Sequence, residues 1–182
     1  VAEVEFVLYG SFAQTGRGHG TDRALLAGIL GLDPDDERLR DSFALARERG
    51  LAFRFTNSQE EAGHPNTVRI KARSRAGRRS EILGCSIGGG SILITQINGT
   101  EVEFTGEYPT VIIRYTDKPG MVAVLSSILA GEGVNIAFMR VFRNSRGLGA
   151  TMILETDQPI STELAGRLKK ADSEICEVLV VD

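Results

Sequence analysis

From residue 108 to the C-terminus, short apolar runs alternate with segments whose apolar residues recur every three or four positions. The runs are four predicted strands, VIIRY, VNIAFMRVFRN, LGATMILET and EICEVLVVD, with a tight turn at NSRG between the second and third. The apolar residues that recur every three or four positions predict one helix after the first strand and another before the last. The order βαββαβ predicts a ferredoxin-like arrangement, in which two helices cover one face of an antiparallel sheet.

Capping residues set the expected ends of these two helices. The first is predicted to begin near Pro119, because proline is favoured in a first helical turn, with Asp117 available as a cap just before it. Gly131 and Gly133 are predicted to end it. The second helix is expected to follow from Ser161.

The first 107 residues have a different pattern. A strand (Glu3 to Tyr9) and a glycine-rich loop come first, followed by a helix from Thr21 and a second helix from about Pro34 to Gly50. The short strand candidates after them are LAFRF, TVRIKAR, EILGCSI, SILITQI and VEF. This half is therefore predicted to be an α+β module with a mainly antiparallel sheet.

A composition shift marks the expected boundary between the modules. Glycine and acidic residues gather in NGTEVEFTGEYP, and Pro109 biases Tyr108 toward an extended conformation. The predicted domains are residues 1–107 and residues 108–182, and the fold class of both is α+β.

Charge and hydropathy exclude some classes of function. The net charge of −3 argues against a general nucleic-acid binder, and no run of eighteen apolar residues is present to cross a membrane. The first ten residues lack the pattern of a signal peptide, so the expected location is the cytoplasm. The basic segment KARSRAGRRS is interpreted as a solvated hairpin between two strands in preference to a polyanion site.

The segment GSFAQTGRGHGTD (residues 10–22) is the densest cluster of candidate binding residues. Its glycines would let the backbone approach a ligand, and free amides at the start of the following helix would favour an anion. Arg17 and His19 add side-chain donors. Plain turns use glycine equally often, and the spacing matches neither a Walker loop nor a dinucleotide fingerprint.

Two further polar segments stand between predicted strands. GCSIGGGSI (residues 84–92) offers the hydroxyls of Ser86 and Ser91, although a hairpin or bulge is the favoured interpretation. HPNT supplies His64 and Asn66. His19 and His64 are the only histidines of the chain, and both fall in polar loops that contain glycine.

Several kinds of catalytic centre are not expected. The sequence contains no HExxH motif and no clear Ser-His-Asp arrangement. Its two cysteines, Cys85 and Cys176, cannot supply the three or four thiolates that an iron–sulfur cluster usually needs. A self-sufficient metalloenzyme is therefore not expected.

Taken in order, GSFAQTGRGHGTDRALLAGILGL, HPNT and LGCSIGGGSILITQING resemble the beta chain of bacterial iron–sulfur-dependent L-serine dehydratase (L-serine ammonia-lyase). The resemblance covers nearly the whole chain. It implies an allosteric substrate-binding domain, of the kind found in some phosphoglycerate dehydrogenases, followed by an ACT domain. It also implies a separate alpha chain that carries the cluster and converts L-serine to pyruvate and ammonia, so that this chain holds no catalytic residue, metal or cofactor of its own.

The resemblance also implies two sets of binding residues. The first set would line a ligand-binding or subunit-contact surface of the first module: Gly16, Arg17, Gly18, His19, Gly20, Thr21, Asn57, His64, Asn66, Thr67, Ser86, Gly88, Gly89 and Gly90. The second would contact an effector such as L-serine or another small amino acid: Asp117, Lys118, Pro119, Gly120, Asn135 and Ile136. Helix-start amides would take its carboxylate and Asn135 its amino group. An ACT module that only dimerises is the alternative.

Three functional hypotheses stay open from the sequence. The leading one is a regulatory and structural subunit of an ammonia-lyase, and its rival is a stand-alone amino-acid sensor without a lyase partner. A third is an enzyme in its own right that uses His19 and His64 as acid and base. Under each, a homodimer is the expected state, because side-by-side pairing would bury an exposed sheet edge.

Overall fold

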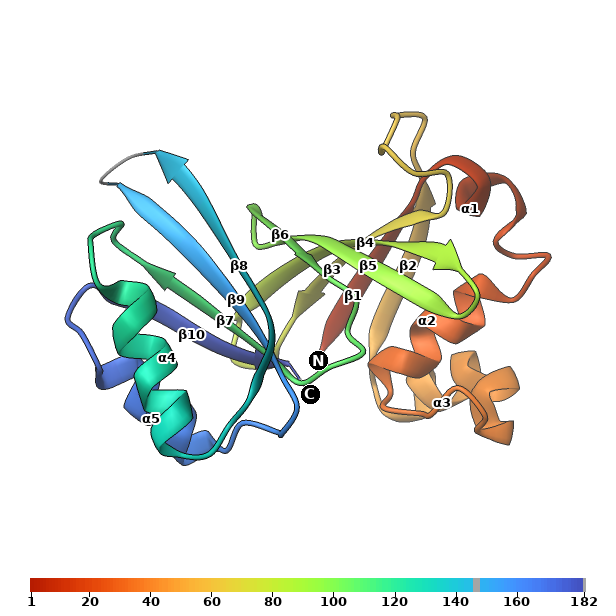
Figure 1. Ribbon diagram of the computed structural model, residues 1–182. Coiled ribbons are helices and arrows are strands. Elements are labelled where there is room, and N and C mark those ends of the chain that lie inside the picture. The colour runs from red at the N-terminus through yellow and green to blue at the C-terminus, as the bar shows by residue number, and fades with distance from the viewer. Residues whose placement is uncertain (146–147, 182) are drawn as a thin grey trace. The chain divides into compact units, whose positions relative to one another are not determined.

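The computed structural model describes residues 1–145 and 148–181 (Figure 1). The chain divides into two compact units, Val1–Gly99 and Thr100–Asp182. The division falls after Gly99, whereas the sequence placed the domain boundary after residue 107. Part of the predicted NSRG turn, Arg146 and Gly147, lies outside the described residues.

The first unit alternates helices and strands before it becomes a strand meander. Its elements are β1 (Glu3–Leu8), α1 (Gly10–Thr15), α2 (Thr21–Ile29), the 3₁₀ helix η1 (Glu37–Asp41), α3 (Ser42–Glu48), β2 (Ala52–Asn57), β3 (Thr67–Arg73), β4 (Arg79–Gly88) and β5 (Ser91–Ile97). The sheet order is β2-β1-β3-β4-β5-β6, where β6 is Thr100–Phe104. The β1–β2 pair is parallel, whereas the β1–β3, β3–β4 and β4–β5 pairs are antiparallel. The predicted mainly antiparallel sheet is confirmed.

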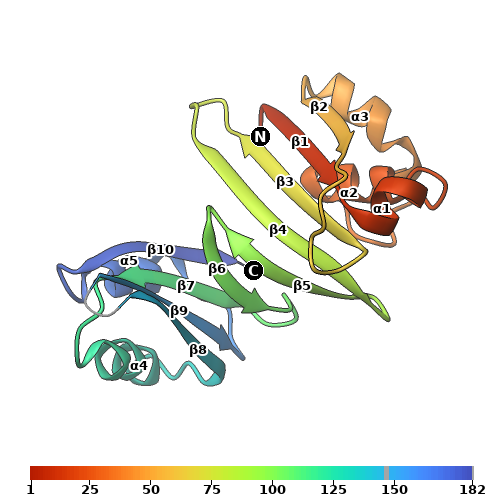
Figure 2. The same ribbon diagram turned by 90° about the horizontal axis from the view of Figure 1, so that it is seen from above.

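The core of the first unit lies on one face of this sheet. Val4, Phe6 and Leu8 occupy alternate positions of β1 and are buried against α2 and α3. The Phe6 ring stacks on Phe55 of β2, with centroids 4.6 Å apart. Figure 2 shows the helices gathered over the β1–β2 side of the sheet. On the opposite face, alternate residues form ion pairs such as that between Arg54 and Glu5.

Two helix predictions in this unit need correction. The glycine-rich segment was predicted to be a loop, but its first six residues form α1, which is too short to show an apolar period. The helix expected from Pro34 is divided into η1 and α3, because the side chain of Asp36 caps a 3₁₀ turn by accepting from the Arg38 amide. The basic segment forms the β3–β4 hairpin as predicted, with the Ser74 amide donating to the Arg78 carbonyl (2.8 Å).

The second unit has the predicted ferredoxin-like topology. After β6 come β7 (Thr110–Tyr115), α4 (Met121–Gly131), β8 (Ile136–Ser145), β9 (Gly149–Thr156), α5 (Thr162–Lys170) and β10 (Ile175–Val181). The four strands β7 to β10 form an antiparallel sheet in the order β10-β7-β9-β8. Arg140 of β8 contacts Glu155 of β9 (2.6 Å) and Glu103 of β6 (3.7 Å), which associates β6 with this unit.

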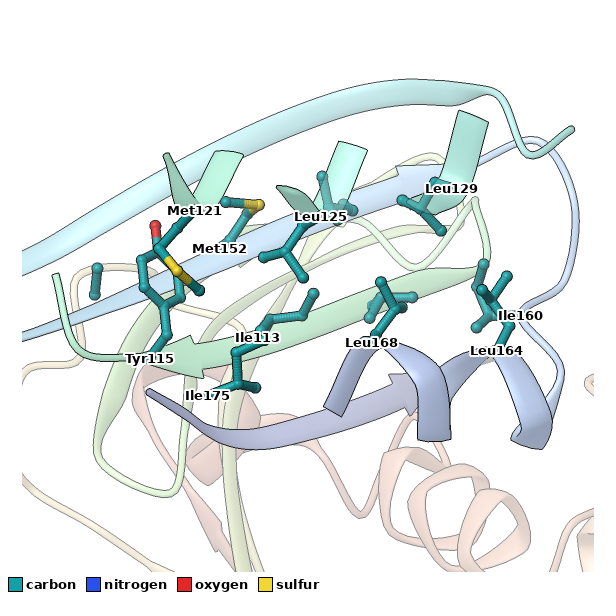
Figure 3. Packing of buried hydrophobic residues seen from close by; sticks show 13 residues of the cluster. Ile113, Tyr115, Met121, Leu125, Leu129, Met152, Ile160, Leu164, Leu168 and Ile175 are labelled. Carbon is teal, nitrogen blue, oxygen red and sulfur yellow. The ribbon is translucent and has the colours of Figure 1, made fainter. Parts of the chain in front are cut away.

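Helices α4 and α5 cover one face of that sheet and enclose its core (Figure 3). Ile113 and Tyr115 of β7 point to this face, because side chains alternate along a strand. Figure 3 shows Tyr115 and Met121 at one end of the cluster and Leu129 and Ile160 at the other. Burial of this face is the main source of the unit's stability.

The ends of the two helices agree with the sequence in part. The Ser161 hydroxyl caps α5 by accepting from the Leu164 amide (3.1 Å), as predicted. Helix α4 begins at Met121 instead of Pro119, and its cap position is Gly120, whose φ of +91° is unfavourable for other residues. The predicted cap, Asp117, accepts hydrogen bonds from Arg143 of β8 instead.

Truncation of Leu125 tests the importance of this packing. Leu125 of α4 is fully buried, so Leu125→Ala is expected to lower the free energy of unfolding by about 2 to 5 kcal/mol, since it leaves a cavity. Val124 is its exposed neighbour on the same helix, and Val124→Ala is expected to cost less than about 1 kcal/mol. Urea denaturation followed by circular dichroism measures both, and equal costs would contradict the packing described.

Candidate functional site

The HPNT segment forms the cap of helix α1. The Pro65 carbonyl accepts hydrogen bonds from the amides of Ser11 (2.6 Å) and Phe12 (3.4 Å) at the start of that helix. Gly10 has a φ of +50°, and a β-carbon added there would lie 2.6 Å from the Pro65 oxygen. Two of the three segments that carried the resemblance are therefore joined by a close backbone contact.

The predicted site residues around this contact have structural partners. His64 Nδ1 accepts from the Asn66 amide (3.2 Å), so the proton of the neutral ring is on Nε2. The Thr67 hydroxyl donates to the His64 carbonyl (2.7 Å), and the Asn66 carbonyl accepts from the Ser86 amide (3.0 Å). Asn57 Nδ2 donates to the Ala13 carbonyl in α1 (2.8 Å). These bonds hold the HPNT loop in one conformation against β4 and α1.

The glycine-rich loop is closed by its own hydrogen bonds. The amides of His19, Gly20 and Thr21 donate to the Thr15, Arg17 and Gly16 carbonyls at 3.2, 3.4 and 2.9 Å. The Thr21 amide is one of the helix-start amides that were expected to be free for an anion. In the first turn of α2, Asp22 Oδ1 accepts from the next amide (2.8 Å). The side chains of Arg17 and His19 in this loop are exposed to solvent.

An apolar groove of about 590 Å³ lies between α2 and the strands β3, β4 and β5. It brings together four of the predicted site residues, His19, Gly20, Thr21 and Ser86. Aliphatic side chains from α2 and from the strands lie beside them. Its apolar wall is made largely by Leu25, Ile29, Val68, Ile70, Ile82, Ile92 and Ile94. Such a lining with a polar end suits an apolar ligand or a protein partner.

The remaining predicted residues of the first unit do not line this groove. His64 lines a different pocket of about 370 Å³ together with Gln14 and Glu60. Gly88, Gly89 and Gly90 form the turn between β4 and β5, where all three have positive φ angles. Because His19 and His64 line different pockets, the structure offers no basis for their joint action as acid and base.

The second unit has a pocket of about 780 Å³ at the start of α4. The predicted residues Asp117, Lys118, Pro119 and Gly120 line it, together with Arg143 of β8. Arg143 Nε donates to Asp117 Oδ2 at 2.9 Å. The pocket therefore has a carboxylate and a guanidinium paired with each other.

Neighbouring groups fix the loop that carries Asp117. Lys118 Nζ donates to Asp172 Oδ1 (2.8 Å), and this bond lowers the pKa of the Asp172 carboxyl. The Thr116 amide donates to the Glu174 carbonyl (3.1 Å). At the pocket wall, burial raises the pKa of the Tyr115 hydroxyl, and the negative charge of Asp117 raises it further. Tyr115 is thus a neutral hydrogen-bonding group near neutral pH.

Asn135 and Ile136 lie at the other end of α4. The helix has eleven residues, which separates its ends by about 16 Å at 1.5 Å per residue. Asn135 Nδ2 donates to Asp157 Oδ2 (2.7 Å), and its backbone amide donates to Gln158 Oε1 (2.9 Å). Within one chain, Asn135 therefore lies far from the predicted effector loop, Asp117 to Gly120.

Sequence reasoning missed Arg143 and Tyr115 as pocket residues. The register places Arg143 of β8 and Tyr115 of β7 on either side of Ala150 in β9. Alternation along β8 could have assigned Arg143 to the helix-covered face, because Met139 and Val141 precede it at intervals of two. The position of Arg143 beside the start of α4 depends on the strand order, which no local sequence pattern indicates.

The two cysteines do not fit an iron–sulfur cluster in this chain. Cys85 is buried in β4 of the first unit, and burial raises the pKa of its thiol. Cys176 is exposed in β10 of the second unit. Two thiols in separate units cannot provide the usual three or four thiolates. Within residues 1–145 and 148–181, no three His, Cys, Asp or Glu side chains are grouped to hold a metal ion.

Each of the two units contains a segment that matches a family model. Residues 1–49 match the family "Serine dehydratase beta chain", and residues 110–173 match the ACT domain. The second unit is therefore an ACT domain. No helix of the described part of the chain is long and apolar enough to cross a membrane.

Curated relatives extend the match over both units. The chain is 42% identical to the L-serine dehydratase beta chain of Peptoniphilus asaccharolyticus, over 89% of this chain and 73% of that protein. It is 36% identical to a probable L-serine dehydratase beta chain of Bacillus subtilis, over 96% of this chain and 79% of that one. D-3-phosphoglycerate dehydrogenase of Mycobacterium leprae is 30% identical over 71% of this chain but only 25% of its own length. The chain belongs to the L-serine dehydratase beta-chain family.

A pair of glycine substitutions tests the contact between Gly10 and Pro65. Gly63→Ala places alanine at a φ of +67° in open space and is expected to cost about 1 to 2 kcal/mol of unfolding free energy. Gly10→Ala adds a clash with the Pro65 carbonyl, so it is expected to cost at least about 1 kcal/mol more. Chemical denaturation measures both variants. Equal costs would show that the HPNT loop moves away without penalty.

Proposed function

We propose that this chain is the regulatory and structural subunit of an L-serine dehydratase. In this proposal a separate alpha chain holds the iron–sulfur cluster and eliminates water from L-serine, giving pyruvate and ammonia. The observation that carries it is the 42% identity to a dehydratase beta chain across 89% of this chain. The two free thiols suit the reducing cytoplasm, where we place the complex.

The first unit supplies the proposed contact with the alpha chain. Its groove combines an apolar wall with the polar ends His19, Thr21 and Ser86, and a subunit interface needs both a buried apolar centre and a polar rim. Arg17 extends from the adjacent loop and is exposed. We therefore assign the glycine-rich loop to subunit contact in preference to anion binding, since the amides of His19, Gly20 and Thr21 already donate within the loop.

The ACT unit supplies the proposed regulation. We propose that L-serine or another small amino acid binds near Asp117 to Gly120 and changes the affinity or activity of the assembled enzyme. An effector that also contacted Asn135 and Ile136 would have to bridge two copies of the chain, because these residues lie at the far end of α4. A homodimer through edge strand β8, where Phe138 and Val141 are exposed, would supply such a second copy.

A stand-alone amino-acid sensor is the second candidate function. The pocket beside Asp117 favours it, since that pocket requires no lyase partner. The two functions differ in what happens when an alpha chain is added. A sensor alone would bind an amino acid without forming a complex.

Turnover of L-serine under anaerobic conditions tests the leading proposal. We expect pyruvate formation by the mixture of this chain with a cluster-loaded alpha chain, and none by either chain alone. Absorbance of the cluster confirms that the alpha chain is loaded. An alpha chain fully active by itself, or no activity in the loaded mixture, would refute the subunit role.

Substitution of Arg17 tests the assigned contact surface. Arg17→Ala is expected to lower activity of the mixture at limiting alpha chain by about tenfold, as truncation of an interface arginine often does. Its melting temperature should be unchanged, because the side chain is exposed. Arg23→Ala, which removes an exposed arginine from α2, is the control and is expected to keep full activity. Equal activities for both variants would remove Arg17 from the interface.

A further inference from the structure

The helices of the first unit cover only part of one face of its sheet. On the face that carries the core, one row of residues crosses β1, β3, β4 and β5 at Leu8, Val68, Gly84 and Ile94. Helices α1 to α3 gather over the β1–β2 side of this face (Figure 2). On β5, Ile92 lines the groove and is 44% exposed. Because helices usually cover the apolar face of a sheet, the β4–β5 side is suited to a further helix.

Small residues form the side of α2 that borders the groove. Ala24 and Gly28 are one helical turn apart, and both are exposed and line the groove. A β-carbon added at Gly28 would meet no atom within 4 Å beyond its own helix backbone. Glycine inside a helix is less favourable than alanine, and no contact within the described residues requires it here. The space beside Gly28 would let the backbone of a partner helix approach α2 closely.

The polar end of the groove carries donors and a positive charge. His19, Thr21 and Ser86 line this end, and the exposed side chain of Arg17 belongs to the same loop as His19. None of the described residues that line the groove is acidic. A partner segment with a carboxylate at this end would pair with Arg17, whereas one with a lysine or arginine would be repelled.

We propose that this groove receives an amphipathic α-helix of the alpha chain. Its apolar residues recur at i, i+3 or i+4 and i+7, as is usual for a helix in a groove, and pack on Ile92 and Ile94. An aspartate or glutamate at one end of the helix pairs with Arg17. The inference rests on the subunit contact proposed above and adds the kind of segment that forms it. A second copy of this chain and an apolar small molecule are the alternative occupants.

Filling the groove tests the site. Gly28→Leu places an aliphatic side chain in the space beside α2, so it is expected to weaken binding of the cluster-loaded alpha chain by at least about tenfold in calorimetry. The melting temperature of this variant should not fall, because leucine has a higher helix propensity than glycine. Gly166→Leu is the matched control, since Gly166 lies in α5 of the ACT unit and also faces open space. Equal affinities of the two variants would overturn the inference.

A photoreactive side chain at the groove identifies the occupant. Ile92 is replaced by p-benzoylphenylalanine, the complex with the alpha chain is irradiated, and mass spectrometry locates the cross-links. They are expected in one alpha-chain segment with the apolar spacing given above. A synthetic peptide of that segment should compete with the alpha chain and gain helical circular dichroism on binding. Cross-links to a second copy of this chain, none to the alpha chain, or a peptide that binds without becoming helical would each overturn the inference.

A charge exchange tests the polar end of the groove. Arg17→Glu is expected to weaken binding of the alpha chain by at least about tenfold, and lysine in place of the acidic residue of the cross-linked helix should restore binding. Failure of this restoration would contradict the pairing. Pyruvate formation is measured separately. An active mixture without cross-links from position 92 would overturn the inference and leave the subunit role intact, whereas helix binding without turnover would overturn that role alone.

Discussion

The pleat of the ACT sheet is the constraint on which the rest of the second unit depends. Side chains alternate between its faces, so one register decides both what is buried and what lines the pocket. Ile113 and Tyr115 point toward the helices, and the neighbouring strands bring Ala150 and Arg143 into the same row. A shift of one residue in β8 would bury a different set of side chains and remove Arg143 from Asp117. The large buried core thus positions the small polar site.

In the first unit, the backbone carbonyl of Pro65 has a comparable role, because it positions α1. The Pro65 oxygen accepts from two amides of α1, and those amides have no partner within so short a helix. Glycine at position 10 permits this approach because a side chain would occupy the place of the oxygen. The position of α1 in turn determines where the glycine-rich loop begins. The groove beside α2 therefore depends on a hydrogen bond formed more than fifty residues along the chain, at HPNT.

Most elements of the fold could be predicted from the sequence because their signals are local. Short apolar runs identified β7 to β10, glycines ended α4, and the Ser161 hydroxyl capped α5. Helix α1 was missed because six residues are too few to show a period, and Asp117 was taken for a cap because its attraction to Arg143 spans 26 residues. Interactions set by strand order rather than by sequence neighbours carry no local signal.

Because long-range contacts have no local signal in the sequence, the fold brings together only some of the predicted site residues. The family resemblance named residues of the glycine-rich loop and of β4, and the fold brings His19, Thr21 and Ser86 to one groove. It could not show that the amides of His19, Gly20 and Thr21 already donate within the loop, which leaves fewer amides for an anion and favours a role for the exposed side chains.

A ligand can regulate a partner only if it binds two states of the protein with different affinities. In the ACT unit, the effector site proposed at Asp117 to Gly120 would provide that difference, because Arg143, which lines the same pocket, lies on β8, the edge strand of the sheet. A charged ligand in this pocket would lie beside the guanidinium of Arg143 and would change the charge distribution along this edge. Any surface that docks along β8 would then distinguish the two states, even if the backbone of the rigid sheet did not move.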